Sequence, residues 1–525
     1  MRRKFSIVLI FALALVFVFP SNVSANRNGN ASNGGRRIIG DMSFFGGISE
    51  GVRLPRTTEQ MLADQRPARQ QRDSTSLRYT EMVTLTGIPV RFDGTLDVTV
   101  SGNVDMDAEV GSFTKTHRVT PNASTDDGVS INRNINFYVT YRVAGSQVVF
   151  TYESTPAWSE VITVNGQTYT LDASMSHFNV SLLEDRTPGV SYYRGNVSAH
   201  LVYVTTGGTV VTRDLQSTFY GFRSPWSTTE THRLDAIVTA PDWALHYQIR
   251  PSMTMNKVLQ WVNNEVTPIS FEGNFREVTQ NNTGLRYDIF VAPNFAWDQP
   301  TSGVVSIVTP NTFEQLPTHD LTFLRGNSAE DDIRRLFAMQ IFTGDPRFVR
   351  PGQAITRGQF VASVARAIRL PIEPPEPPRR GRNVLPDTSV FHDVPRERPE
   401  YPYIMAAYRA GLAVGRANSM FYFDYPIDRQ EAFMIMIRAL GLSNLSTTPT
   451  PVTPFADDAL IAGWARREVS VALQIGLAHP DDNGFLHPTR QLSVGEAANI
   501  LNELVEYMRV GLVSDYADQI VNIVR

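Results

Sequence analysis

A short motif that starts a helix occurs three times in the C-terminal part of this 525-residue chain, and it constrains the fold more than any other feature. The motif pairs a capping residue with a Gln or Glu three positions later: Thr356 with Gln359, Asp428 with Glu431, and Ser493 with Glu496. In such a capping box the first side chain accepts a hydrogen bond from a backbone N–H at the helix start, and the second reaches back. The sequence therefore predicts three helix starts.

A second helical stretch precedes each of these helix starts, and a turn with an aromatic residue separates the two stretches. The pattern predicts one helix–loop–helix unit repeated three times, at a period of roughly 65 to 70 residues. The predicted units span 321–370, 390–442 and 453–510, with a proline-rich linker at 371–389, a shorter linker at 443–452 and a tail at 511–525. We therefore expect the C-terminal region to be an all-α domain.

Residues 78–320 show a different pattern, because apolar and polar residues alternate along successive stretches. Alternation with period two, in stretches rich in Val, Thr, Tyr and Phe, is typical of β-strands with one buried face. Asn165-Gly166 lies between two such stretches and predicts a type I′ hairpin turn. We expect antiparallel strands in a sandwich-like fold, as one large or two small domains.

The N-terminal residues predict export. A basic start, an apolar stretch and small residues before Ala25 are typical of a signal peptide at 1–25, and 26–77 is predicted to be a polar, largely disordered leader. No later stretch is long and apolar enough to predict an integral membrane segment. The chain has no cysteine, which excludes disulfides and thiolate metal sites. A formal net charge of −4 argues against a nucleic-acid-binding protein.

The three helical units resemble the S-layer homology (SLH) family, whose modules typically occur in threes on bacterial cell-surface proteins. The family pattern runs from an aromatic-x-Asp start, through a turn with glycines, to a helix start that carries an arginine. The matching residues are Phe391, Asp393, Gly411, Gly415 and Arg429 in the second unit, Phe455, Asp457, Trp464 and Glu496 in the third, and Gly344, Pro351 and Arg357 in the first. The first unit departs from the pattern because it lacks the aromatic-x-Asp start, and the third because it has Val494 in place of the arginine.

The resemblance implies an exported surface protein that is held non-covalently on secondary cell-wall polysaccharide, in many cases through a pyruvylated sugar. It implies grooves between units that bind the polymer around Arg357 and Arg429, and a degenerate groove at Val494. The implied polysaccharide-binding residues are Arg357, Arg429, Thr356, Asp428, Gly344, Gly415, Asp393, Asp457 and Trp464. The β-rich region would face outward, either in a self-associating surface layer (S-layer) or as an accessory component of the cell surface.

The chemistry of the helix starts favours an anion site without reference to the family. Arg357 and Arg429 directly follow the capping residue, beside backbone N–H groups that carry partial positive charge. A guanidinium can bind a carboxylate, such as that of a pyruvyl group, through two parallel hydrogen bonds. The alternative is that both arginines pair with neighbouring carboxylates and that the capping-box residues only cap helices.

The β-rich region contains no recognisable catalytic motif, and we expect neither enzyme activity nor a cofactor. It has no phosphate-binding loop, dinucleotide fingerprint or serine nucleophile elbow. Paired glycosidase carboxylates are defined in space and not by spacing, so an SLH-anchored carbohydrate-active enzyme or carbohydrate-binding protein is the competing hypothesis. Asp105, Asp107 and Glu109 alternate in a turn-like stretch and are a calcium candidate, with a solvated acidic loop as the alternative.

Overall fold

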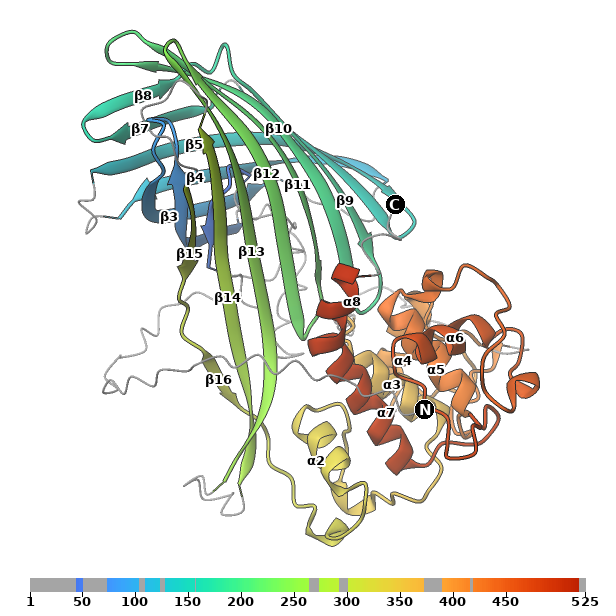
Figure 1. Cartoon of the computed structure of the whole chain (residues 1–525). Coiled ribbons are helices and arrows are strands. Elements are labelled where there is room, and N and C mark those ends of the chain that lie inside the picture. Colours follow the sequence, from blue (N-terminus) through green and yellow to red (C-terminus); the bar gives the residue numbers. More distant parts are fainter. Residues whose placement is uncertain are drawn as a thin grey trace, which may run out of the picture. The chain divides into compact units, whose positions relative to one another are not determined.

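The computed structural model describes residues 44–50, 73–102, 109–122, 128–155, 157–263, 273–291, 301–372, 390–415 and 419–518. Within these ranges a large antiparallel β-sheet region is followed along the chain by a helical region (Figure 1). The expected order of an all-β region and then a helical region is confirmed. The predicted signal peptide at 1–25 lies outside the described residues.

The strands of the described chain form one sheet of sixteen strands, where the sequence suggested a sandwich. They are β1 (Ile48–Ser49), β2 (Asp73–Val83), β3 (Val90–Ser101), β4 (Val110–Pro121), β5 (Val129–Ala144), β6 (Gln147–Ser154), β7 (Ser159–Val164), β8 (Gln167–Leu171), β9 (His177–Arg186), β10 (Ser191–Thr205), β11 (Val210–Arg223), β12 (Ser227–Ala240), β13 (Trp243–Val262), β14 (Asn274–Val291), β15 (Thr301–Ile307) and β16 (Thr312–Gln315). Period-two patterns predict strands but carry no information about how many sheets the strands form.

Most strands pair with their neighbours in sequence, and every pairing is antiparallel. Two short pairs share the space between the long strands β5 and β10: β6 with β9, and the hairpin β7–β8. The hairpin turns at Asn165-Gly166, where both residues have positive φ (50° and 82°), as a type I′ turn requires. The predicted hairpin is therefore confirmed.

The strands alternate between a buried and a more exposed face, as their sequence pattern predicts. In β5 the side chains of Ile131, Ile135, Phe137 and Val139 are fully buried, and the alternate residues Asn132, Asn134, Asn136 and Tyr138 are more exposed. The four buried side chains belong to one apolar cluster that extends across the sheet. Burying a large apolar side chain stabilises the fold by about 1.5–3 kcal/mol, so the alternation accounts for which face is inward.

The buried face of the sheet also holds charges that the sequence did not reveal. Arg133 lies between Glu81 and Glu160, with N–O distances of 2.8 and 2.6 Å. Burial acts to raise the pKa of Glu81, but its ion pairs with Arg133 and Arg213 hold that pKa below its ordinary value. The Glu81 carboxylate is therefore charged, and both acids are engaged by Arg133 within the sheet.

The helical region consists of short helices joined by loops and 3₁₀ turns (Figure 1). The helices are α2 (Glu330–Ala338), α3 (Arg357–Ala367), α4 (Tyr401–Arg409), α5 (Arg429–Leu440), α6 (Arg466–Gln474), α7 (Val494–Glu506) and α8 (Leu512–Asp518). The 3₁₀ turns are η1 (Thr322–Leu324), η2 (Pro346–Phe348), η4 (Ser443–Leu445) and η5 (Asp458–Leu460). A π-helical turn, η6 (Tyr507–Gly511), joins α7 to α8, so the helix continues past the expected unit boundary at 510.

Three of these helices, α3, α5 and α7, start in equivalent surroundings. At each start the first backbone N–H donates to a carbonyl of the loop that precedes another of the three helices. The bonds are Arg357 N to Tyr425 O (2.7 Å), Arg429 N to Arg490 O (3.0 Å) and Val494 N to Gln353 O (2.8 Å). Because α3 contacts the loop before α5, α5 the loop before α7, and α7 the loop before α3, the contacts close a ring.

Two of these loops are each held in place by an aspartate, one half-buried and the other buried. Asp393 accepts hydrogen bonds from the backbone N–H groups of Phe421 (2.7 Å) and Phe423 (3.0 Å). Asp457 does the same for Leu486 and His487 (2.9 and 2.7 Å). Both aspartates are the acidic residue of the aromatic-x-Asp motif, so the motif serves to fix the loop that precedes the helix start.

Side chains of the β-sheet region hydrogen-bond to carbonyls at the C-terminal ends of α3 and α5 and to a carbonyl of η6. Trp226 Nε1 donates to Ala367 O in α3 (2.7 Å), and the Tyr192 hydroxyl donates to Leu440 O in α5 (2.9 Å). The hydroxyl of Ser227 donates to a carbonyl of η6. Carbonyls at a helix end lack partners within the helix, so these bonds satisfy groups that would otherwise need water.

Candidate functional site

The first residue of α3, α5 and α7 defines three equivalent positions, occupied by Arg357, Arg429 and Val494. The sequence predicted ligand contacts for both arginines and a degenerate groove at the valine. The three positions have diverged in the structure: Arg357 is buried, Arg429 lines an open cavity, and Val494 lines a smaller cavity.

Arg357 is engaged by the protein itself and is only 2 % exposed. Its Nε donates to Glu431 Oε1 at 2.7 Å, and its two terminal nitrogens donate to the carbonyls of Phe421 and Val414. The guanidinium carbon also lies 4.2 Å from the centre of the Phe421 ring. Arg357 thus matches the alternative in which the arginine pairs with a neighbouring carboxylate. The sequence could not separate the two cases, because Glu431 belongs to another helix start.

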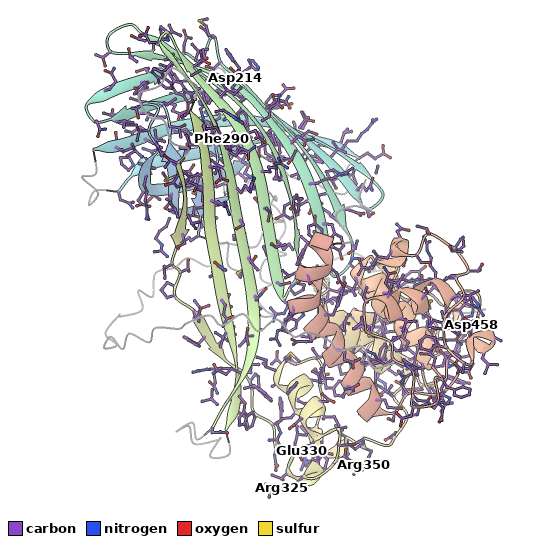
Figure 2. The ribbon with its side chains drawn as sticks, in the orientation of Figure 1. Asp214, Phe290, Arg325, Glu330, Arg350 and Asp458 are labelled. Carbon is purple, nitrogen blue, oxygen red and sulfur yellow. The ribbon has the colours of Figure 1, made fainter. Side chains whose placement is uncertain are left out.

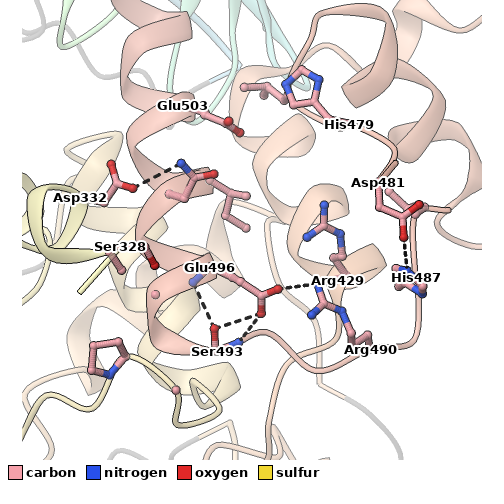
Figure 3. Close-up of a pocket in the computed structure, with 18 of the residues that line it drawn as sticks. Ser328, Asp332, Arg429, His479, Asp481, His487, Arg490, Ser493, Glu496 and Glu503 are labelled. Atoms are coloured by element: carbon pink, nitrogen blue, oxygen red, sulfur yellow. Dashed lines mark hydrogen bonds and ion pairs between the residues drawn. The ribbon is translucent and has the colours of Figure 1, made fainter. Parts of the chain in front are cut away.

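Arg429 lines a cavity of about 670 Å³ between the start of α5, the loop before α7, and residues 327–332 and 351–352 (Figure 3). Its Nε is buried and has no hydrogen-bond partner among the described residues. The guanidinium carbon lies 5.5 Å from the Phe433 ring centre. Burial and the nearby charge of Arg490 lower the pKa of Arg429, so the cation is not fully compensated by the protein.

The acids that line this cavity are mostly engaged with other groups. Glu496 accepts from the backbone N–H and hydroxyl of Ser493, at 3.0 Å each, and pairs with Arg490 (Figure 3). Although burial acts to raise it, these bonds hold the pKa of Glu496 below its ordinary value. Asp481 pairs with His487 at 2.9 Å. The Glu503 carboxyl, in contrast, has a pKa raised by burial.

The backbone N–H groups at these helix starts are not open to a ligand, contrary to expectation. At α5 the N–H groups of Arg429 and Gln430 donate to loop carbonyls at 3.0 and 2.9 Å, and Asp428 accepts from Glu431 N at 2.9 Å. The same arrangement holds at α3 and α7. An anion at Arg429 would therefore be bound by the guanidinium and not by the helix end.

Two of the three predicted capping boxes are complete, at α3 and α7, and at α5 Asp428 accepts from Glu431 N. Thr356 accepts from Gln359 N and Gln359 reaches back to Thr356 N, both at 3.2 Å. Ser493 and Glu496 form the same reciprocal pair at α7. At α5 the carboxylate of Glu431 carries the ion pair with Arg357 described above.

The predicted glycines play two different roles. Gly344 has φ of +99°, in the left-handed region that favours glycine, and it lines the cavity at Val494. Gly415 does not have positive φ; a Cβ there would lie 2.6 Å from the Phe391 ring, so glycine is required by close packing. In that second turn the left-handed residue is Gly411 (+71°).

The remaining predicted polysaccharide-binding residues do not line the cavity at Arg429. Asp393 and Asp457 hold loops, as described above, and Trp464 precedes α6 with 51 % of its surface exposed. Of the calcium candidates, Asp105 and Asp107 lie outside the described residues. In the part of the chain that the structure describes, no group of three or more acidic, His or Cys side chains could hold a metal ion.

Sequence reasoning missed several residues that line the Arg429 cavity, namely His479, Asp481, His487 and Arg490. They belong to the loop between α6 and α7, whose sequence predicted only a turn. The available signal was the density of charged and His residues around the aromatic of that loop. That signal becomes specific only when Arg429, far away in sequence, is placed beside it.

Comparison with known proteins supports the SLH resemblance for part of the helical region. The S-layer homology domain family matches residues 390–433, which include α4, the Asp393 loop and Arg429. An SLH domain indicates association with the cell surface or cell wall and implies binding to cell-wall polymers. None of the described helices is long and apolar enough to cross a membrane.

Three curated proteins are similar to part of the chain. An amylopullulanase of Thermoanaerobacterium thermosulfurigenes is 28 % identical over 193 residues, which is 36 % of this chain and 10 % of that protein. An endoglucanase of Bacillus sp. (strain KSM-635) is 25 % identical over 33 % of this chain and 17 % of its own length. The exoglucanase XynX of Acetivibrio thermocellus is 26 % identical over 40 % of this chain and 18 % of its own length. The chain thus spans less than a fifth of each relative.

Proposed function

We propose that the helical region consists of three SLH units and holds the chain non-covalently on an anionic polysaccharide of the cell wall. The ring of equivalent hydrogen bonds at the starts of α3, α5 and α7 supports three units, although the family match covers only residues 390–433. The observation that carries the binding function is the cavity at Arg429, with its unpaired buried Nε.

The electrostatics of this cavity favour a negatively charged ligand. Burial and repulsion from Arg490 lower the pKa of Arg429. Three acids of the cavity are already engaged by the protein: Glu496 by Arg490, Asp481 by His487 and Asp332 by Asn502. A carboxylate placed between the arginines would relieve this repulsion and could accept two parallel hydrogen bonds from a guanidinium. A pyruvyl group on a wall sugar presents such a carboxylate.

The test is co-sedimentation of the purified protein with cell-wall sacculi, before and after extraction of the secondary polysaccharide. We expect the protein to pellet only with polymer-bearing sacculi, and Arg429→Ala to remain in the supernatant. Arg233→Ala removes an equal charge from a side chain of the sheet that is 64 % exposed, and should pellet like the wild type. Pelleting that is unaffected by extraction, or by Arg429→Ala, would contradict the proposal.

The β-rich region is the displayed part of the protein and has no enzyme activity in this proposal. It would serve as an S-layer subunit or as an accessory component of a secreted, wall-associated surface. The engagement of Glu81 and Glu160 by Arg133 supports a structural role for the buried acids of the sheet. The names of the relatives favour the competing function, in which this region acts on carbohydrate.

An assay for reducing ends separates these two functions. We expect no release of reducing sugar when the protein is incubated with pullulan, cellulose, xylan or isolated wall polysaccharide. Release that scales with protein concentration and survives repurification would establish the carbohydrate-active alternative.

A further inference from the structure

The last strand in the order of the sheet, β15, has one edge that no strand of the described chain covers. β15 pairs with β14 from Thr301 opposite Ile289 to Ile307 opposite Thr283, and the strand order ends there (Figure 1). The backbone N–H and C=O groups along its other edge therefore have no strand partner among the described residues. Groups of this kind form a template on which a further strand can be added.

The sequence of β15 favours the addition of a strand. Residues 301–308 read TSGVVSIV, in which five of the eight residues are β-branched and none is charged or proline. Val304 is 74 % exposed and Val308 is 79 % exposed, so contact with another strand would remove apolar surface from water. Gly303 belongs to the packing of β15 on β14, because a Cβ there would lie 2.4 Å from the Tyr287 hydroxyl.

Exposed apolar surface continues from the edge strand onto its neighbour. Phe290, near the end of β14, is exposed, and its ring stacks on that of His246 in β13 with ring centres 5.4 Å apart (Figure 2). An exposed edge that is apolar and uncharged is a surface that soluble proteins ordinarily protect. We therefore looked for such protection at both ends of the strand order.

The other end of the strand order is protected. β1 is only two residues long and is followed by Glu50, whose carboxylate pairs with the Arg78 side chain of β2 at 3.0 Å. Arg78 also donates to the carbonyl of Val308, just past the end of β15. Short edge strands and charged side chains both disfavour strand addition. The exposed edge of β15 is therefore not complementary to the β1–β2 end of another copy.

The edge of β15 is complementary to itself. Every pairing in the sheet is antiparallel, and a two-fold axis would bring β15 of two copies together in the same antiparallel way. Like charges directly opposite one another destabilise a pair of strands, and 301–308 contains no charge that could oppose its own copy. A second copy of the chain therefore fits this edge.

We propose that two copies of the protein associate through β15, with the two edge strands paired antiparallel in one continuous sheet. Because both copies use the same surface, the contact closes at two copies and does not by itself propagate into a lattice. A surface layer built from this protein would need a second contact surface. The inference goes beyond the proposed function and does not depend on it, since the dimer forms without polysaccharide.

The test is analytical ultracentrifugation of the full chain without polysaccharide, at protein concentrations up to about 1 mM, the order that tethering to a common surface provides. We expect a reversible monomer–dimer equilibrium for the wild type. Val304→Lys should raise the dimer Kd about tenfold or more, because it loses an apolar contact and brings two like charges together. Val304→Glu should do the same alone, and an equal mixture of the two variants should dimerise again.

A matched control places the same charge away from the edge. Ile237 is exposed on β12, which pairs with β11 on one side and β13 on the other, so Ile237→Lys should dimerise like the wild type. Because the chain has no cysteine, single-cysteine variants report the contact directly. At least one of Ser302→Cys, Val304→Cys and Ser306→Cys should form a disulfide-linked dimer on mild oxidation, and Ile237→Cys should not.

The outcomes separate this inference from the wall-binding proposal. A wild type that stays monomeric throughout, or a dimer that Val304→Lys leaves unchanged, would overturn the inference. Pelleting with sacculi is measured independently and depends on Arg429, so either result leaves that site to its own test. Circular dichroism of Val304→Lys verifies that the variant is folded.

Discussion

The arginine position of the repeated motif has two different structural roles in this chain. Arg357 is buried in an ion pair with Glu431, whereas Arg429 lines a cavity and retains an unpaired nitrogen. Their local sequences are alike, since both follow a capping residue at a helix start. The difference arises from the side chains that the neighbouring unit presents. A structural arginine and a binding arginine are therefore indistinguishable at the level of the motif.

Replacement of Arg357 should be strongly destabilising. Arg357→Ala leaves the Glu431 carboxylate buried without its cation, and breaking a buried pair in this way costs about 3–5 kcal/mol. Denaturant unfolding followed by circular dichroism measures this loss. The double variant Arg357→Met/Glu431→Gln removes both charges and should recover most of the stability; equal stability of Arg357→Ala and wild type would contradict this account.

Replacement of Arg429 should have the opposite profile. Because burial and Arg490 disfavour its charge, Arg429→Met should leave the free energy of unfolding unchanged or raise it by up to about 1 kcal/mol. The same variant should no longer bind wall polysaccharide. Unfolding curves and binding assays on one preparation test both parts, and a loss of stability as large as that of Arg357→Ala would show Arg429 to be structural.

At the scale of elements, the loops between paired helices are held by single carboxylates. Asp393 accepts two backbone hydrogen bonds, and such charge-assisted bonds contribute about 1.5–3 kcal/mol each. Asp393→Ala should therefore destabilise the protein by about 2 kcal/mol or more. Asp424→Ala, at a side chain of the same loop that is 72 % exposed, is the matched control and should change stability by less than about 0.5 kcal/mol.

The contribution of Asp393 should also depend on pH. Burial acts to raise the pKa of Asp393, but the N–H groups of Phe421 and Phe423 hold it below the ordinary 3.8. A depressed pKa in the folded state means that the contribution is complete above pH 3.8 and is lost as the pH falls through the folded value. The difference in unfolding free energy between wild type and Asp393→Ala should thus be constant from about pH 5 to 7 and shrink in acid. A difference that grows in acid would contradict this.

The sequence predicts elements better than it predicts what joins them. Helix starts at Thr356, Asp428 and Ser493 follow from local capping chemistry, and the strands follow from their alternation. The single sheet could not be predicted, because pairings that skip strands, such as β6 with β9 and β8 with β10, leave no signal in the alternation of apolar and polar residues. The reason for glycine at position 415 could not be predicted either, since the Phe391 ring that excludes a Cβ there comes from outside the turn.

At the scale of the whole molecule, strand residues and helix residues share one apolar cluster. Val190, Tyr192, Phe222 and Trp226 from the sheet region pack with the buried residues of the helical region. The charged cavity at Arg429 could be predicted only in part. The sequence identified the arginine, but the cavity needs residues 327–332, 351–352 and 477–503 to meet around it.

Trp226 tests whether the shared cluster couples the two regions. Trp226→Ala removes a side chain that is 3 % exposed and a hydrogen bond to Ala367 O, at a cost of about 3–5 kcal/mol. We expect the helical signal in circular dichroism and the near-ultraviolet signal to shift together to lower denaturant concentration. Trp464→Ala, at an exposed tryptophan, should change little; a helical transition that stays at its wild-type midpoint in Trp226→Ala would contradict the coupling.

The most direct test of the account is binding of wall polysaccharide before and after its carboxylate-bearing groups are removed by mild acid. We would titrate both polymers into the wild type, Arg429→Ala and Arg429→Lys. The account predicts tight binding only for the wild type with the intact polymer, weakened binding for Arg429→Lys because the guanidinium fork is lost, and none for Arg429→Ala. Equal binding of intact and acid-treated polymer, or full binding by Arg429→Ala, would contradict an anion site at Arg429.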